Sequence, residues 1–240
     1  MINYFQKLYK GTKNDFFNLL KNDLAQDNKR FIVTANPEAF VLGKENPDID
    51  RLLTDDNTTV VADGIGIVKG ADMVGIKIEE RIPGVDIAEK LFSYGNEMKK
   101  SVFLFGSKKE VISALLGKLS ENYPDLVIAG AVDGYREDKD KVFDEIAAAA
   151  PDIVLVALGM PAQERLIYKH LFRFNKGIFV GVGGSFDVLS GTKERAPEFF
   201  IKHNIEWLYR IVKEPKRLKR FYNNNIKFIF QLKNLKTGDK

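Results

Sequence analysis

Short apolar runs alternate with amphipathic helical patterns from residue 31 to residue 182, and this alternation restricts the chain to few folds. The runs are rich in β-branched residues and cover 31–35, 58–62, 102–105, 126–130, 152–158 and 177–182. Nearly continuous apolar character is typical of strands in a parallel sheet that helices cover on both faces. The pattern therefore predicts a doubly wound α/β fold with a mainly parallel, Rossmann-like sheet.

Helical spacing of apolar residues fills the intervals between the later strands. The predicted helices cover 86–100, 108–123, 139–150 and 161–175. In the second of them Val111, Leu115 and Leu119 recur on one face. Ligands of doubly wound sheets bind beyond the carboxyl ends of the strands, so the residues that follow each strand are the candidates for chemistry.

The pattern changes after Gly191, where the strands stop and the sequence becomes helical, aromatic and basic. We therefore predict a catalytic core over 1–195 and a helical appendage over 196–240. The appendage is expected to contain a helix over 206–213 and a second one from Pro215 to about Lys233. The second helix carries an apolar stripe opposite a basic face. The stripe comprises Leu218, Phe221, Tyr222, Ile226 and Ile229, and the basic face comprises Lys216, Arg217, Arg220 and Lys227. Such a helix packs on a core or enters a membrane interface.

The basic charge belongs to the appendage. The whole chain has a net charge of +4, but residues 202–240 carry 11 Lys+Arg and 3 acids, which leaves the preceding part acidic. A basic block suits nucleic acid, an anionic membrane surface or a phosphate-bearing substrate. A nucleic-acid-binding module is the alternative from another functional class. The acidic balance of the core and its polar strand ends argue against it, and no nucleic-acid partner is expected.

Several functional classes are excluded by composition. The chain has no cysteine and two isolated histidines, His170 and His203, which excludes disulfides and cysteine-containing zinc sites. Two Asp-x-Asp pairs, at 48–50 and 138–140, have the spacing of metal-dependent sugar-nucleotide sites, but both lie in charged segments. No metal site is predicted. No signal peptide is expected at Met1–Lys10, and no apolar run approaches the roughly 18 residues of a membrane span.

Two segments that follow predicted strands carry groups suited to acid–base chemistry or to phosphate binding. Asp63 directly follows the run 58–62 and precedes Gly64, which makes it a candidate general base at the mouth of a cleft. The alternative is an N-cap for a helix that begins near Ile65. The segment 181–191, GVGGSFDVLSG, offers backbone N–H groups to a diphosphate. It matches neither GxGxxG nor a P-loop, so nicotinamide and P-loop chemistry are disfavoured.

Six segments occur in an order and spacing that span nearly the whole chain: TANPEAF (34–40), VVADGIGIV (60–68), ERIPGVD (80–86), LGMPAQE (158–164), GVGGSFDVLSGTKERAP (181–197) and IEWLYRIVKEPKRLKRF (205–221). Together they closely resemble the WecG/TagA/CpsF family of bacterial glycosyltransferases. The likeness is greatest to the TagA branch, the N-acetylmannosaminyltransferases of wall teichoic acid linkage-unit synthesis.

The resemblance implies an inverting transfer of N-acetylmannosamine from UDP-N-acetylmannosamine to undecaprenyl-diphosphate-linked N-acetylglucosamine. It implies no metal or other cofactor, and a peripheral location on the anionic cytoplasmic face of the cell membrane. Related branches transfer glucose or N-acetylmannosaminuronic acid, so another sugar remains the alternative. Formation of a homo-oligomer is left open.

The resemblance also implies roles for individual residues. Asp63 matches the general base. The pocket and nucleotide contacts match Thr34, Asn36, Arg81, Gln163, Gly183, Gly184 and Asp187, and the appendage arginines expected to meet diphosphate match Arg210, Arg217 and Arg220. A metal-free transfer needs fixed cations for the leaving diphosphate, and arginine supplies a charged bidentate fork. For Arg81 the alternative is an ion pair with Glu79 or Glu80, and for Gln163 it is a structural position in the first turn of a helix.

Overall fold

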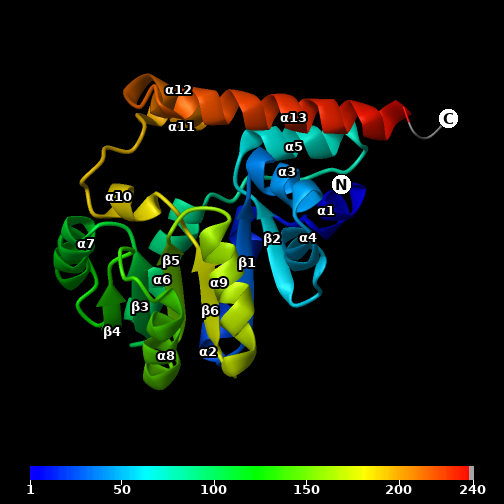
Figure 1. Cartoon of the computed structure of the whole chain (residues 1–240). Coiled ribbons are helices and arrows are strands. Elements are labelled where there is room, and N and C mark those ends of the chain that lie inside the picture. Colours follow the sequence, from blue (N-terminus) through cyan, green and yellow to red (C-terminus); the bar gives the residue numbers. More distant parts are fainter. Residues whose placement is uncertain (238–240) are drawn as a thin grey trace.

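Six parallel strands form one sheet in the computed structural model (Figure 1), which describes residues 1–237 except the side chains of Arg210, Arg217, Arg220, Lys236 and Thr237. The strand order is β2-β1-β6-β5-β3-β4. The strands are β1 (Lys29–Ala35), β2 (Thr58–Ala62), β3 (Ser101–Gly106), β4 (Val127–Val132), β5 (Ile153–Ala157) and β6 (Gly177–Gly181). All six coincide with the predicted runs, and the doubly wound α/β fold is confirmed.

Helices cover both faces of the sheet. One face packs against α3 (Pro37–Glu45), α4 (Pro47–Thr54), α8 (Lys139–Ala149), α9 (Ala162–His170) and the short 3-10 helix η1 (Leu171–Arg173), with α1 (Ile2–Lys7) and α5 (Ile65–Met73) beside them. The other face packs against α2 (Lys13–Ala25), α6 (Gly84–Glu97), α7 (Lys109–Asn122) and α10 (Ser185–Leu189). The four predicted helices are present, with ends shifted by at most five residues.

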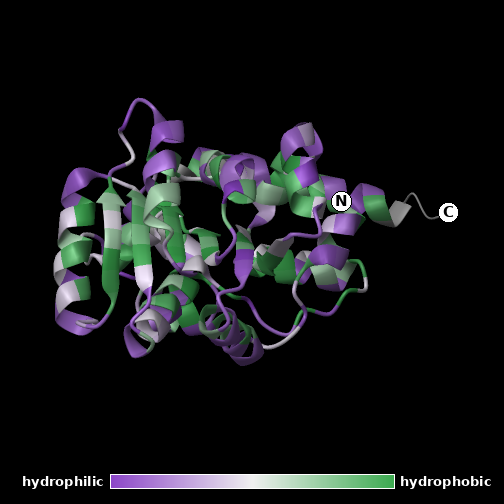
Figure 2. Ribbon diagram, turned by 90° about the horizontal axis from the view of Figure 1, so that it is seen from below, coloured by the Kyte–Doolittle hydropathy of each residue, from purple (hydrophilic) through white to green (hydrophobic). Residues whose placement is uncertain are grey.

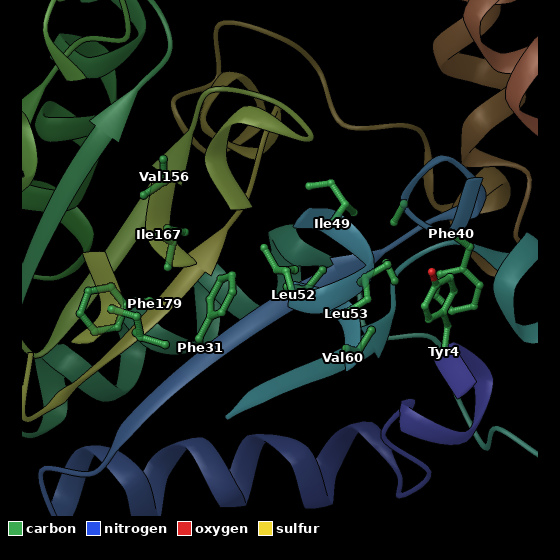
Figure 3. Packing of buried hydrophobic residues seen from close by; sticks show 14 of the residues in the cluster. Tyr4, Phe31, Phe40, Ile49, Leu52, Leu53, Val60, Val156, Ile167 and Phe179 are labelled. Atoms are coloured by element: carbon green, nitrogen blue, oxygen red, sulfur yellow. The ribbon is translucent and has the colours of Figure 1, made fainter. Parts of the chain in front are cut away.

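Alternate strand residues feed two separate hydrophobic clusters. Phe31 and Val33 point into the cluster on the α3–α9 side, whereas Ile32 points into the cluster on the α2–α6 side. Figure 3 shows the first cluster, where Phe31, Val156, Ile167 and Phe179 meet between the sheet and α9. Hydrophobic residues accordingly concentrate in the strands and the inward helix faces, while the outward faces are hydrophilic (Figure 2). Burial on both faces explains why the strands read as continuous apolar runs.

Capping residues mark the starts of α2 and α3, two helices that were not predicted from the sequence. Thr12 and Asp15 form a capping box at the start of α2. The Asn36 side chain accepts a hydrogen bond from the N–H of Ala39, and Pro37 occupies the first turn of α3. These caps place the first turn of α3 directly after β1, at the carboxyl edge of the sheet.

The appendage lies across this carboxyl edge as α11 (Glu198–Lys202), α12 (Glu206–Lys213) and α13 (Arg217–Thr237), with α13 over α3 and α5 (Figure 1). The Trp207 and Phe221 rings stack, with centroids 4.7 Å apart, and join α12 to α13. No helix in the described part of the chain has both the length and the apolar character needed to cross a membrane.

The face of α13 that packs on the core is not the stripe identified from the sequence. Phe228 and Leu232 are buried in the cluster that also contains the α3 and α5 side chains. Phe228 fills a notch at Gly70, where an added Cβ would lie 2.8 Å from the Phe228 ring. Four of the five stripe residues are exposed instead: Leu218, Tyr222, Ile226 and Ile229. The helix therefore has two apolar faces, and the sequence boundary at 195/196 remains a prediction.

Candidate active site

Three strand exits bring predicted site residues into one connected group. The Thr34 hydroxyl, at the end of β1, donates to the carbonyl of Gly181 at the end of β6 (3.1 Å). Thr34 also lies against Gly84, whose added Cβ would be 3.4 Å from the threonine methyl group. Gly84 N in turn donates to Asp63 at the end of β2. The resulting group lies at the carboxyl edge, where doubly wound folds bind ligands.

Asp63 is held at this edge by both its backbone and its side chain. Its N–H donates to the carbonyl of Ala35, and its Oδ1 accepts from Gly84 N at 2.9 Å. The N-cap of α5 is Gly64, without a side-chain cap, so the alternative role of Asp63 as the cap of that helix is wrong. The carboxylate instead meets the first residue of α6. It is half-buried, which suits a base that must receive a proton from a bound hydroxyl.

Arg81 is a fixed cation between the core and the appendage. The N–H of Ile82 donates to the carbonyl of Ala62 at 2.7 Å, which places this segment beside the exit of β2. The Arg81 guanidinium lies 3.6 Å from the Glu206 carboxylate of α12, and both side chains are largely buried. The predicted alternative is wrong, because Glu79 pairs with Lys77 and Glu80 accepts from the N–H of Lys13.

Gln163 joins the exits of β5 and β6. Its Oε1 accepts from the N–H groups of Gly159 and Gly183, each at 3.0 Å, and its Nε2 donates to Glu164 at 2.7 Å. The side chain is 3% exposed, so it supports the glycine loop from beneath. Gly183 has φ +48°, in the left-handed region that favours glycine. Gly184 follows on the same loop as the N-cap of α10, and Asp187 in the first turn of α10 lies 3.5 Å from Lys193 Nζ.

Asn36 lies beside the Asp63 loop. Its Oδ1 caps α3, and the Asn36 Cβ is 3.8 Å from the position of an added Cβ on Gly64. The remaining predicted residues are Arg210, Arg217 and Arg220, whose side chains lie outside the described residues. Their helices, α12 and α13, run along the same carboxyl edge (Figure 1).

Sequence reasoning missed an ion-pair cluster that ties the appendage to the core. Asp86 of α6 accepts from Lys13 Nζ at 3.0 Å and from the Arg195 guanidinium. Burial opposes ionisation of Asp86, but these hydrogen bonds outweigh it and lower the pKa. Arg195 belongs to the segment that leads into α11, so the cluster anchors that segment to α6. Asp86 and Arg195 lie in the quoted motifs, but nothing in their spacing indicated that they meet.

Both Asp-x-Asp pairs have structural partners. Asp48 pairs with Arg165, and Asp50 accepts from the Tyr4 hydroxyl. In the second pair Asp138 caps α8, and Asp140 contacts Lys169 and His170. Among the described residues, no three His, Cys, Asp or Glu side chains are grouped so that they could hold a metal ion.

Comparison with known proteins decides the family. The family model described as "Glycosyl transferase WecG/TagA/CpsF family" matches residues 5–239. The chain belongs to this glycosyltransferase family. The match confirms the resemblance carried by the six motifs, and it extends through the appendage into α13.

Several relatives of known name share the family. A Bacillus spizizenii protein named N-acetylglucosaminyldiphosphoundecaprenol N-acetyl-beta-D-mannosaminyltransferase is 41% identical over 197 residues, which cover 82% of this chain and 76% of that protein. A Bacillus subtilis protein of the same name is 41% identical, covering 79% of this chain and 73% of its own length. A Staphylococcus aureus protein of that name is 36% identical, with coverages of 80% and 76%.

Proposed function

We propose that the protein transfers N-acetylmannosamine from UDP-N-acetylmannosamine to undecaprenyl-diphosphate-linked N-acetylglucosamine, in wall teichoic acid linkage-unit synthesis. The observation that carries this proposal is the 41% identity, over about four fifths of the chain, to relatives named for this reaction. The connected group around Asp63 and Gln163 supports it, because both residues occupy matching motif positions at one sheet edge.

The proposed mechanism is a single displacement. Asp63 accepts the proton of the acceptor hydroxyl, whose oxygen then attacks the anomeric carbon on the face opposite the diphosphate. The bond between that carbon and the diphosphate oxygen breaks, UDP leaves with its negative charge, and the configuration inverts. In this proposal Arg81 and the N–H groups of the glycine loop stabilise that charge, with Arg210, Arg217 and Arg220 as further cations. No metal or other cofactor is included in this proposal.

The acceptor's lipid requires the enzyme to work at a membrane surface. Leu218, Tyr222, Ile226, Ile229 and Phe230 form an exposed apolar strip along α13, which we call the α13 strip. Two exposed lysines lie near its start, Lys216 in the turn before α13 and Lys219 in the first turn of the helix. An apolar strip flanked by cations suits an anionic interface. We therefore propose peripheral association with the cytoplasmic face of the membrane, without a nucleic-acid partner; homo-oligomer formation stays open.

Turnover with a panel of UDP-sugars tests the proposal. The acceptor is a short-chain lipid diphosphate N-acetylglucosamine, and each reaction is run with and without EDTA. We expect product from UDP-N-acetylmannosamine, with unchanged rate in EDTA. Faster turnover of UDP-glucose or of the UDP-linked uronic acid would replace the proposed sugar with the alternative. Loss of activity in EDTA that Mg²⁺ or Mn²⁺ restores would contradict the metal-free mechanism.

A further inference from the structure

Glu164 lies on the inner face of α9, where an aliphatic side chain would ordinarily pack. Its side chain is 1% exposed, and Ile167 and Leu171, three and seven residues later, continue the same buried face. Its Oε2 has no hydrogen-bond partner within the described part of the chain. Burying a carboxyl group costs more than burying an alkyl chain, and such departures from good packing are found at functional sites.

The contact that Glu164 makes determines the orientation of a neighbouring amide. Its Oε1 accepts from Gln163 Nε2 at 2.7 Å. The other end of that amide, Gln163 Oε1, faces two N–H donors, those of Gly159 and Gly183. A reversed amide would place its NH₂ group against both donors and its oxygen against the Glu164 oxygen. Glu164 therefore adds to the two N–H donors in favouring the one orientation in which Gln163 can accept from Gly183.

Both side chains also lie directly against the end of β6. An added Cβ at Gly181 would be 2.5 Å from Gln163 Nε2 and 2.7 Å from Glu164 Oε1. The carbonyl oxygen of Gly181 accepts a hydrogen bond from the Thr34 hydroxyl. The backbone that leads into the glycine loop is thus fixed between Thr34 and the pair formed by Gln163 and Glu164.

The charge state of Glu164 agrees with this location. Burial raises its pKa to about 7, and the Glu38 carboxylate of α3 adds to the rise. In its neutral form the carboxyl group still accepts the Gln163 hydrogen bond. It then adds no negative charge beneath a loop that faces an anionic ligand.

We propose that Glu164 is a positioning residue for the donor substrate: through Gln163 it holds Gly183 and the loop that follows in the orientation that receives the diphosphate of a UDP-sugar. The inference rests on the proposed function for the identity of the donor. Glu164 itself need not touch the nucleotide.

The test compares three full-length variants by calorimetric UDP binding and by kinetics with the soluble acceptor. Glu164→Met keeps the side-chain length and removes the acceptor atom. We expect it to weaken UDP binding and raise donor KM about tenfold or more, with kcat and acceptor KM within about threefold. Glu164→Gln keeps a neutral acceptor and should retain UDP affinity within about threefold. Glu145→Met, at an exposed position on α8, is the matched control and should change nothing.

Two results would overturn the proposal: normal UDP affinity in a folded Glu164→Met protein, or Glu164→Gln being as impaired as Glu164→Met. If the methionine variant does not fold, Glu164→Asp withdraws the acceptor by one methylene and gives the same comparison. A wild-type protein that binds another nucleotide and not UDP would contradict the proposed function instead. The same variants, titrated with that nucleotide, would then still decide the role of Glu164.

Discussion

The Asp63 carboxyl group has two roles: it accepts a hydrogen bond from the first residue of α6, and it is the general base of the proposed mechanism. Asp63→Asn keeps an oxygen for Gly84 N, so the loop should stay in place while the base is lost. We expect normal UDP-sugar binding and a turnover lower by at least about 10²-fold. Asp72→Asn, at an exposed position on α5, is the matched control. Near-normal turnover in Asp63→Asn would limit this residue to its contact with α6.

Glu164 also predicts how stability depends on pH. Its folded-state pKa of about 7 lies above the ordinary glutamate value of 4.5. Between these two values the unfolded chain loses the proton while the folded protein keeps it, so this group lowers stability as pH rises from about 4.5 to 7. Glu164→Gln removes that effect. Its free energy of unfolding should exceed that of the wild type by more at pH 8 than at pH 5, with a difference on the order of 2 kcal/mol.

Urea unfolding of both proteins at the two pH values measures this difference. If the free energies of unfolding of wild type and Glu164→Gln differed by the same amount at pH 5 and pH 8, Glu164 would ionise normally in the folded protein.

Site residues could be predicted where they directly follow a strand. They could not be predicted where their role depends on a contact with a residue distant in the sequence. Asp63 and Gln163 follow apolar runs and belong to recognisable motifs. The pairing of Arg81 with Glu206 depends on α12 folding back over the core, so the local sequence offered only Glu79 or Glu80 as alternative ion-pair partners. The burial of Glu164 depends on Gly181 from β6 and could not be read from α9 alone.

At the scale of elements, the docking of α13 depends on one missing side chain. Gly70→Ala would place a methyl group 2.8 Å from the Phe228 ring and 3.1 Å from Phe5. Overpacking of this kind costs about 1–3 kcal/mol, more than the helix propensity that alanine adds. We expect a lower melting temperature and faster proteolysis within α13.

Gly117→Ala is the matched control for this substitution. Gly117 also lies in a helix, α7, but an added Cβ there has no atom within 4 Å. Its melting temperature should stay level or rise. Equal behaviour of the two variants would mean that Phe228 can move aside at no cost.

The second apolar face of α13, the α13 strip, is the surface that we propose binds the membrane. Replacing Ile226 and Phe230 of the α13 strip by serine should weaken binding to anionic vesicles at least about tenfold, because their apolar area no longer leaves water. Turnover of the soluble acceptor should be retained. Sedimentation with vesicles measures the first effect. The control is Phe172→Ser on η1, where the ring is 80% exposed but lies outside this strip. Equal weakening by Phe172→Ser would contradict the assignment of this face.

The strand positions could be predicted from the sequence, but the orientation of α13 could not. The runs of β2 and β6 were found almost to the residue, because burial on both faces demands unbroken apolar sequence. The packed face of α13 was not found, since its choice depends on the notch at Gly70 and on Phe5 and Phe40. A helix with two apolar faces gives no internal sign of which one is buried.

Across the whole molecule, the appendage contributes both to stability and to the proposed site. A chain ended after Arg195 keeps all six strands but loses Phe228 and Leu232 from the core cluster, and Glu206 from Arg81. We expect a folded sheet with a melting temperature lower by several degrees and almost no turnover of the soluble acceptor. Circular dichroism and the transferase assay measure the two effects. Full activity in the shortened protein would remove the appendage from catalysis.

The aromatic contacts of Phe228 also set an order of events during synthesis. Its ring lies 6.2 Å from Phe5 and 6.3 Å from Phe40, so α13 packs against residues that are synthesised long before it. Until α13 has been made, the nascent chain lacks Phe228 and Leu232 and leaves the apolar site against α3 and α5 uncovered. Closure of that site and the contact of Glu206 with Arg81 both depend on the same late segment. A chain that stops before α12 is therefore expected to be both poorly packed and inactive.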